Sequence, residues 1–362
     1  MTVAARYTLE EMPRQVDALA DDLRALVTPT AERARQTLST ASWENITRVV
    51  LTGNGDSYHA ALATEMAFAS LAGVACEPRS TLRLLEYGIP DKRDIESARS
   101  TLTVAISASG GNARAVQTLT RASRSGARTL AITCSPGSLL AQAADHALIV
   151  PLPPVQPCPG IRTYQASLLG LFLVAIELGQ ARTHHLPVQP EKLLAELTAA
   201  GDAIEATSSI IGSACAQLGR RVAGEPVMMM LGSGPSYGSA LFAAAKMVEA
   251  AGVFAAGQDL EEWEHVESLA LPRNMPTFIL GVPGRSRERA VAVARRARDI
   301  GRTVIAVADA TDTELATVAD TVLPLCGTVR EEFSPLLTHI FAGYLTCEVA
   351  RQLNRVPFST KH

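Results

Sequence analysis

The sequence of 362 residues is poor in aromatic side chains and has no long tract of one charge. Aromatic residues make up 4% of the chain and hydrophobic residues 47%. The core must therefore be built from Ala, Val, Leu and Ile, as in parallel sheets covered by helices. The formal net charge is −3, and the absence of a basic tract argues against a nucleic-acid partner.

The cysteines show no CxxC pair and no metal-ligand spacing, so we expect buried thiols in a reducing compartment and no metal site. They are Cys76, Cys134, Cys158, Cys215, Cys326 and Cys347. The N-terminus lacks a charged-then-apolar signal, and no apolar run approaches the ~18 residues of a membrane span. These absences predict a soluble, cytoplasmic protein without a membrane partner.

Lysine is scarce, because 29 of the 33 basic residues are Arg. The lysines are Lys92, Lys192, Lys246 and Lys361. An amine can deprotonate and attack a carbonyl, whereas a guanidinium cannot. Lys361, near the end of the chain, is therefore a candidate nucleophile.

Two strand–turn–helix units begin at residues 48 and 102, and we expect further strands at 129–133, 147–151, 278–282 and 302–307. An apolar run at 48–52 precedes the turn GNGDSY at 53–58, and another at 102–106 precedes SASGGN at 107–112; an Ala-rich helix follows each turn. Such turns present backbone N–H groups and a helix N-terminus to an anion. Neither turn fits the dinucleotide or P-loop motif. The alternative is a tight turn with a helix cap, which is the commoner meaning of such a sequence.

The second half repeats the first. An apolar run at 227–231 precedes GSGPSY at 232–237, which matches GNGDSY at a constant offset of 179 positions. This repeat predicts two copies of one α/β domain related by a pseudo-twofold axis, each a parallel sheet between helices in three layers. We expect a helical segment at 1–44, the first domain at 45–185, a linker at 182–190, the second domain at 191–350, and a tail at 351–362.

Residues 243–265 carry a candidate acid–base pair. Glu249 lies on a helix of small apolar residues, and His265 closes an acidic turn 16 positions later. A carboxylate and an imidazole suit proton transfer between adjacent carbons and the opening of a sugar ring. Taken alone, the segment is more often a helix with one solvated Glu and a loop His.

These motifs together resemble tandem SIS (sugar isomerase) domain proteins. The resemblance is closest to the isomerase half of glucosamine-6-phosphate synthase and to stand-alone aminosugar-phosphate deaminases and deglycases. It covers about residues 45–362. It rests on SYH at 57–59, ISxSG at 106–110, LGxG at 231–234, and the same spacing of Glu249 and His265.

The resemblance implies the following site. Glu249 would move a proton between C1 and C2, His265 would assist ring opening in a site shared across a homodimer, and Lys361 would form an imine with the ketose. No cofactor is implied. The substrate and its phosphate would contact Gly55, Asp56, Ser57, Ser107, Ala108, Ser109 and Asn112.

Several positions depart from the family pattern. Asp56 and Asn112 stand where the family has Thr, Ala108 replaces Gln, and the neighbours of His265, including Glu264, also differ. A negative charge at Asp56 beside a phosphate predicts either another orientation of the substrate or a cationic group on it.

The expected function is a cofactor-independent isomerase, deaminase or deglycase acting on an amino- or N-substituted hexose 6-phosphate, without a glutaminase domain. One alternative is a non-catalytic sugar-phosphate regulator. A DNA-binding regulator is disfavoured because the N-terminal segment has no basic recognition helix. The other is a plain aldose–ketose phosphate isomerase, which usually needs a single SIS unit.

Overall fold

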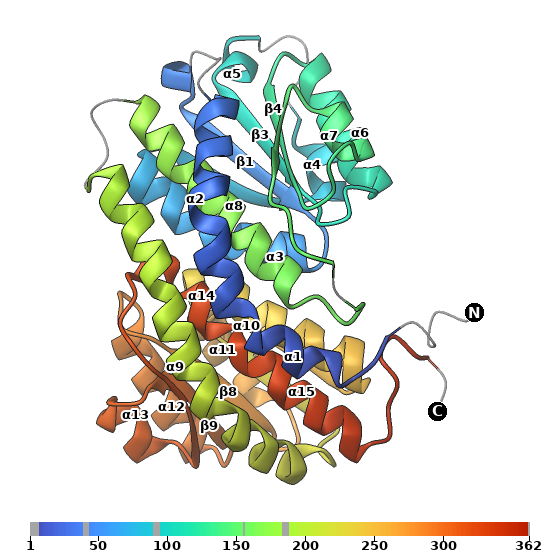
Figure 1. Cartoon of the computed structure of the whole chain (residues 1–362). Coiled ribbons are helices and arrows are strands. Elements are labelled where there is room, and N and C mark those ends of the chain that lie inside the picture. Colours follow the sequence, from blue (N-terminus) through green and yellow to red (C-terminus); the bar gives the residue numbers. More distant parts are fainter. Residues whose placement is uncertain (1–6, 39–42, 90–94, 155, 183–187, 361–362) are drawn as a thin grey trace. The chain divides into compact units, whose positions relative to one another are not determined.

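The computed structural model describes residues 7–38, 43–89, 95–154, 156–182 and 188–360. The chain divides into two compact units, which are described separately. The first-sheet unit comprises Asp21–Pro153 and Thr163–Ala199, and the second-sheet unit comprises Met1–Ala20, Pro154–Arg162 and Ala200–His362. Figure 1 colours both units along the sequence.

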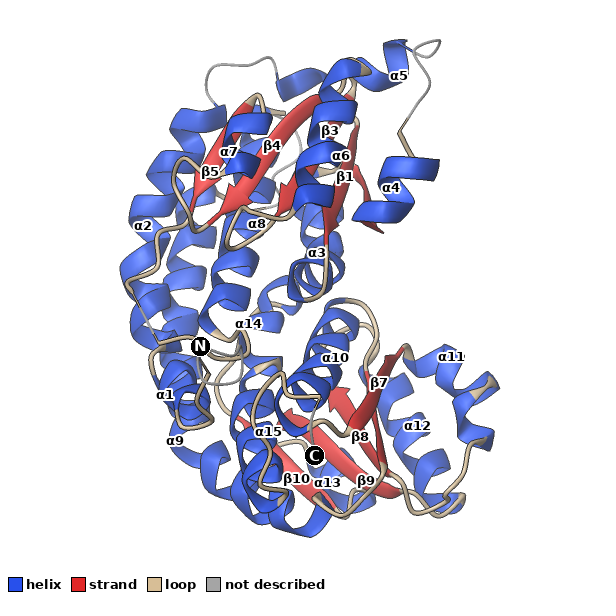
Figure 2. Ribbon diagram, turned by 90° about the vertical axis from the view of Figure 1, so that its right-hand side faces the viewer, coloured by secondary structure: helices blue, strands red, loops and turns tan. Residues whose placement is uncertain are grey.

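The first-sheet unit is built on a parallel sheet with strand order β2-β1-β3-β4-β5. Its strands are β1 (Arg48–Gly53), β2 (Ala75–Ser80), β3 (Thr101–Ile106), β4 (Arg128–Thr133) and β5 (His146–Ile149). The central strand β3 is buried along its whole length, as expected for a strand covered on both faces by helices. Figure 2 shows helices on either side of this sheet.

The helices of this unit are α2 (Leu19–Leu38), α3 (Asp56–Ala67), α4 (Thr81–Tyr87), α5 (Ile95–Arg99), α6 (Ala113–Arg124), α7 (Leu139–Ala143) and α8 (Arg162–Ala181), with the 3-10 turn η2 (Trp43–Asn45) and the π-helical turn η3 (Phe68–Ala72). Helices α6 and α7 pack on one face, where Leu119 and Leu140 meet the alanines of β3 and β4. On α8, a Cβ at Gly170 would lie 2.7 Å from Ile132. The glycine therefore lets α8 approach β4 closely.

By length and mean composition alone, helix α8 could cross a membrane. Of its most apolar 18-residue window, 89% is buried within the protein. Burial of this kind is typical of a helix in the core.

The second-sheet unit repeats the plan, with strand order β10-β9-β8-β6-β7 and all pairs parallel. Its strands are β6 (Val227–Leu231), β7 (Phe254–Gln258), β8 (Pro276–Gly281), β9 (Thr303–Asp309) and β10 (Thr321–Leu325). Its helices are α1 (Glu11–Asp17), α9 (Pro190–Val222, which begins in the other unit), α10 (Pro235–Lys246), α11 (Leu260–His265), α12 (Arg287–Asp299), α13 (Thr313–Val318), α14 (Pro335–Thr338) and α15 (Ile340–Gln352), with the short turns η4 (Met247–Ala251), η5 (Glu267–Leu269) and η6 (Glu331–Phe333). The predicted fold class, two parallel sheets between helices, is confirmed.

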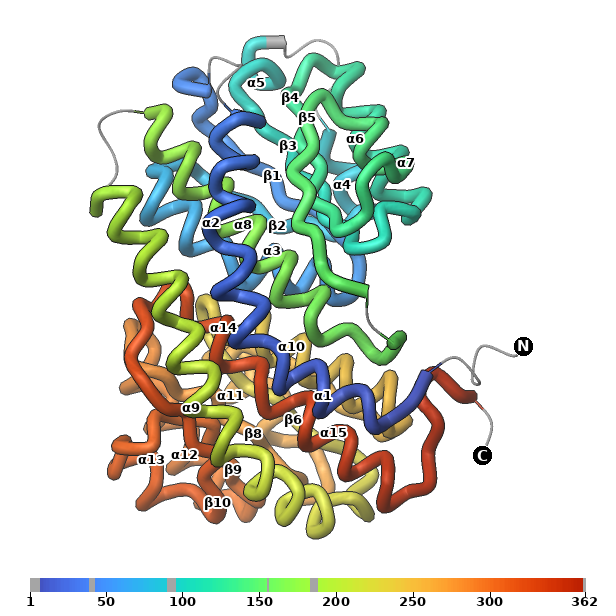
Figure 3. Tube along the Cα trace, in the orientation of Figure 1, coloured from blue at the N-terminus to red at the C-terminus, as the bar shows by residue number. Residues whose placement is uncertain are grey.

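The start and the end of the chain both belong to the second-sheet unit. Helix α1 packs on α15, where a Cβ at Gly343 would lie 2.5 Å from Val16. The Cys347 thiol donates a hydrogen bond to the Leu9 carbonyl at 3.3 Å. In Figure 3 the red C-terminal tail runs beside the blue start of the chain.

Two details differ from the sequence prediction. The acidic residues after Gln258 form the helix α11 rather than a turn, and Asp259 caps this helix by accepting a hydrogen bond from the Glu261 N–H at 2.8 Å. The strands β2, β7 and β10 were not predicted. Of the predicted linker at 182–190, residues 183–187 lie outside the described residues.

Candidate active site

The first glycine-rich turn joins β1 to α3. A Cβ at Gly53 would lie 2.7 Å from the Cβ of Ser57, so glycine lets α3 begin close against the strand. Gly55 has φ 52° and ψ −128°, a conformation that glycine adopts readily. The Thr81 hydroxyl donates to Asn54 Oδ1 at 2.6 Å. The turn is thereby fixed, with Ser57 half-buried in the first turn of α3.

The second turn follows β3 and is also held by its neighbours. The Ala108 carbonyl accepts hydrogen bonds from the Cys134 N–H at 3.0 Å and from the Thr133 hydroxyl at 3.1 Å. Gly110 has φ 63°, and a Cβ there would lie 2.1 Å from the Ser138 Oγ. Ala108 therefore shapes the turn through its backbone, while its methyl group adds no polar contact.

The side chains expected to hold a phosphate differ in exposure. Ser107 is buried and Ser109 is exposed. Asn112 caps α6, since its Oδ1 accepts a hydrogen bond from the Ala115 N–H at 3.0 Å; its amide hydrogens remain as donors. Because β1 and β3 are parallel neighbours, the two turns lie together at the carboxyl edge of the sheet, where ligands of such sheets bind.

Asp56, the most unusual of the predicted contacts, faces a histidine one helical turn away. Its Oδ1 lies 4.0 Å from the Nδ1 of His59, and the two side chains are 22% and 15% exposed. The Asp56 carboxylate thus lies beside an imidazole at the start of α3.

Glu249 lies in the π-helical turn η4, directly after α10. Its Oε2 accepts a charge-assisted hydrogen bond from the Lys246 ammonium, three residues earlier. Lys246 is fully buried, whereas the Glu249 side chain is 29% exposed. π-Helical turns occur frequently at functional sites. The structure thus joins a partly exposed carboxylate to an ammonium that water does not reach.

The Lys246 ammonium packs against an aromatic side chain. The Lys246 ammonium lies 5.0 Å from the centre of the Phe242 ring, and the rings of Phe242 and His339 form a T-shaped pair with their centres 5.7 Å apart. Burial lowers the pKa of His339 to about 4. His339 is therefore neutral at physiological pH and places no second positive charge near Lys246.

The first-sheet unit contains the same π-helical turn without its charges. The turn η3 precedes η4 by the offset of 179 that relates the glycine turns. Ser70 stands there in place of Glu249, and Ala67 in place of Lys246. Only the second copy of the repeat therefore carries the acid–base pair.

His265 ends α11 and its side chain is 68% exposed. Its Nε2 lies 3.5 Å from Glu261 Oε1, and the other carboxylate oxygen of Glu261 lies 2.6 Å from the Arg289 guanidinium. Arg289 also pairs with Glu264, one of the departures from the family pattern. Trp263 of the same helix is buried. The exposed imidazole therefore lies at the end of a helix that is held by packing and by the ion pairs of Arg289.

The segment that follows His265 is held by a buried arginine. The Arg302 guanidinium donates to the carbonyl oxygens of Pro272 at 2.6 Å, Ala270 at 2.8 Å and Glu267 at 3.0 Å, with a fourth bond to Ser268 at 3.2 Å. Arg302 is 4% exposed, and burial lowers its pKa. Its hydrogen bonds fix the backbone between His265 and β8.

Lys361 lies outside the described residues, but the tail before it is attached next to the predicted base. The Phe358 N–H donates to the Glu249 carbonyl oxygen at 2.7 Å, and the ring of Phe358 packs on that of Tyr7 at 4.8 Å. The described part of the tail is therefore held beside Glu249.

Family comparison adds to this geometry. The SIS domain model matches residues 44–175 and again residues 224–353. The chain belongs to the SIS family. The predicted resemblance to tandem SIS proteins is thus confirmed.

The SIS chain is 27% identical over 352 residues to the glutamine–fructose-6-phosphate aminotransferase (isomerizing) of Mycolicibacterium smegmatis. The match covers 95% of this chain and 54% of that enzyme, so the chain spans about half the length of the curated relatives it matches. The C-terminal domain of the Francisella tularensis glucosamine-fructose-6-phosphate aminotransferase has the same fold, with a TM-score of 0.81, 17% identity, and coverage of 96% of this chain and 98% of that one. Glucosamine-6-phosphate deaminase of Thermotoga maritima aligns with a TM-score of 0.67 and 17% identity over 94% and 98% of the two chains.

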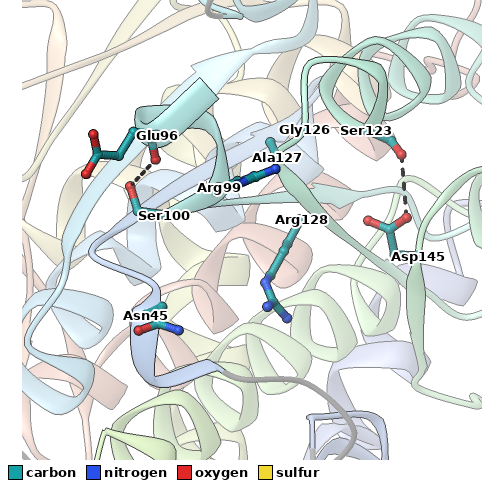
Figure 4. Close-up of a pocket in the computed structure, with 9 residues that line it drawn as sticks. All are labelled: Asn45, Glu96, Arg99, Ser100, Ser123, Gly126, Ala127, Arg128 and Asp145. Atoms are coloured by element: carbon teal, nitrogen blue, oxygen red, sulfur yellow. Dashed lines mark hydrogen bonds between the residues drawn. The ribbon is translucent and has the colours of Figure 1, made fainter. Parts of the chain in front are cut away.

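A hollow of about 650 Å³ in the first-sheet unit lies away from these turns. Its lining residues are Asn45, Glu96, Arg99, Ser100, Ser123, Gly126, Ala127, Arg128 and Asp145 (Figure 4). Asn45 precedes β1, Arg128 begins β4 and Asp145 precedes β5. The hollow is therefore at the amino edge of the sheet, opposite to the glycine turns.

The part of the chain that the structure describes holds no group of three or more metal-ligating side chains. Beside the second turn, burial raises the pKa of the Cys134 thiol to about 12, so the thiol stays protonated. The residue that sequence reasoning missed is Lys246. Two features of the sequence could have indicated it: lysine is rare in this chain, and Lys246 lies three positions before Glu249 in a predicted helix, where the two side chains can pair.

Proposed function

We propose that the SIS chain is a cofactor-independent isomerase that releases the amine of an amino- or N-substituted hexose 6-phosphate. The observation that carries the proposal is the buried Lys246 paired with the partly exposed Glu249 in a π-helical turn. Glu249 is the partly exposed member of this pair, and a positioned carboxylate can act as a general base.

In the proposed reaction the sugar ring first opens, with His265 transferring the proton between the ring oxygen and the hydroxyl at C1. Glu249 then removes the proton from C2 and returns it at C1, which turns the C2 amine into an imine. The Lys361 amine displaces ammonia, or the free amine of an N-substituted sugar, from this imine, and water then hydrolyses the Lys361 imine to the ketose. Each step is a proton transfer, an amine exchange or a hydrolysis, which positioned side chains can catalyse.

The phosphate is proposed to bind at the two turns of the first-sheet unit. Ser57, Ser107 and Ser109 supply hydroxyl groups there, and α6 directs its N-terminus to the same edge. Asp56 supports a substrate that carries a cationic amine, because a carboxylate stabilises such a group. The names of the relatives point the same way, since one is an aminotransferase and one a glucosamine-6-phosphate deaminase.

We further propose that the working form is a homodimer in which His265 serves the neighbouring chain. Val266, Leu269 and Leu271 follow this histidine and are 61%, 78% and 74% exposed. Apolar side chains gathered in this way are typical of a surface that another chain covers. Lys361 is proposed to form the imine with the ketose, as the attachment of the tail at Glu249 supports.

The direct test is incubation with glucosamine 6-phosphate in deuterated water. Ammonia release and deuterium at C1 of the product fructose 6-phosphate, both about 10²–10⁴-fold slower in Glu249→Gln, are the expected results. An N-substituted hexosamine 6-phosphate tests the deglycase form. If these sugars bind but neither exchange nor amine release occurs, the enzymatic proposal is wrong and a binding protein remains.

The dimer proposal has a separate test. Glu249→Gln and His265→Ala are inactive alone in this scheme, but a mixed dimer contains one site with both native residues. Activity that returns on mixing the two variants supports the shared site. Mixed dimers that form without activity contradict it.

A further inference from the structure

The second-sheet unit contains its own version of the turn that follows β3. This second loop, residues 282–286, joins β8 to α12. Aligned on the first residues of α6 and α12, Ser107 is replaced by Gly281 and Ser109 by Pro283. At these two positions the second loop has lost the hydroxyls and, at the proline, one backbone donor, while Ser286 stands in place of Asn112.

In place of these groups the second loop holds a carboxylate of its own chain. The Arg285 N–H donates to Glu331 Oε1 at 2.8 Å, and the Arg285 guanidinium Nε lies 3.9 Å from Glu331 Oε2. The Glu331 carboxylate lies so close to the loop that a Cβ at Gly284 would be 2.4 Å from its carbon. An anion is therefore already bound in the loop, at the place where α12 begins.

The surroundings leave little room beside this carboxylate. The Glu331 side chain is 17% exposed. The neighbouring hollow, lined by Pro283, Asp309 and Ser334 among others, measures about 30 Å³, which admits water but not a phosphate. Ser334 is 2% exposed, and its hydroxyl has no hydrogen-bond partner among the described residues. The Ser334 hydroxyl can therefore bind an anion in the loop once the Glu331 side chain is removed.

We propose that Glu331 occupies the second loop as a built-in anion, and that it prevents this loop from binding a phosphate. The duplicated chain then binds its phosphate at the first-sheet unit only. Removal of the Glu331 side chain uncovers a second anion site for inorganic phosphate or a sugar phosphate, formed by the Arg285 N–H and guanidinium and by Ser334.

The test is the number of inorganic phosphates bound per chain, measured by equilibrium dialysis with labelled phosphate. Glu331→Ala is expected to bind one phosphate more than the wild type. Glu331→Gln keeps a side chain that fills the loop and accepts from Arg285, so it should gain none. A gain in the glutamine variant would show that charge repulsion, rather than occupancy, closes the loop, and would overturn the proposal.

Glu288→Ala is the matched control, because it removes the same charge from an exposed position in the first turn of α12. Glu331→Ser serves if the alanine variant does not fold. A crystal of the variant grown with phosphate should show the ion on the Arg285 N–H. The proposal is wrong if neither folded variant binds more phosphate than the wild type and Glu288→Ala. Wild type that binds none would contradict the proposed function, while the difference between variants would still decide this inference.

Discussion

Replacing Arg302 with methionine should loosen the segment that follows His265 and destabilise the second-sheet unit. Arg302 makes four hydrogen bonds of 3.2 Å or less to backbone carbonyl oxygens. At about 1.5 kcal/mol for each bond to a charged group they would amount to about 6 kcal/mol. Methionine removes the cost of burying a guanidinium, which is several kcal/mol. We therefore expect a net loss of about 2–4 kcal/mol.

The measurement is urea unfolding together with amide hydrogen exchange of residues 266–273. Arg302→Met should speed exchange in this segment beyond the change seen elsewhere in the unit. Arg298→Met is the matched control, because the exposed Arg298 also donates to two carbonyl oxygens, those of Thr317 and Val318. Its loss should cost less than about 1 kcal/mol. Equal stability of the two variants, or unchanged exchange in 266–273, would refute the assigned role of Arg302.

Three further predictions address the site and its support. Glu249→Gln should lower kcat by about 10²–10⁴-fold, the usual contribution of a general base, whereas a steady-state rate within threefold of wild type would remove Glu249 from the mechanism. Deletion of residues 360–362 should reduce turnover comparably, and borohydride with a ketose phosphate should attach the sugar at Lys361; full turnover of the truncated chain would exclude the imine. His339, with its pKa lowered by burial from 6.5 to about 4, holds fewer protons in the folded state than in the unfolded state. Its contribution is complete above pH 6.5 and is lost as the pH falls toward 4, by about 3 kcal/mol in total; His339→Gln should flatten this part of the stability profile, and an unchanged slope would contradict the assignment.

The central strands and the glycine-rich turns could be predicted because β1, β3 and β6 are short, mostly apolar runs, each followed directly by a turn rich in glycine or serine. The missed strands β2, β7 and β10 are all edge strands. They carry proline, charge or glycine, as in ACEPRS and TVLPL. Edge strands tolerate such residues because one side makes no ladder bonds. Their sequences therefore lack the apolar signal.

Helix α11 was mistaken for a turn because its acidic residues hid a helical pattern. Leu260 and Trp263 are buried three positions apart, and Asp259 stands at the cap position. These are the ordinary signs of a short helix. This helical pattern was weak evidence in the sequence, because three of the five residues at 260–264 are glutamates.

The candidate site could be predicted only in part. The spacing of residues within motifs predicted Glu249, His265 and the serines as site residues. Burial of a lysine depends on tertiary packing, so the sequence could not show which lysine is buried. The partner of Glu249 is Lys246, while Lys361, chosen from the sequence, lies outside the described residues. The roles of all these residues remain predictions that the experiments above decide.

The assignment of the first twenty residues to the second-sheet unit has a consequence for synthesis. Leu9 and Asp17 bond to Cys347 and Tyr344, more than 320 positions later. During synthesis on the ribosome, the apolar face of α1 has no partner until nearly the whole chain has been made and α15 emerges. Contacts of such long sequence separation fold slowly and leave apolar surface exposed in the meantime. We expect nascent chains lacking α15 to bind chaperones through α1, and fragments cut between the two SIS domains to aggregate.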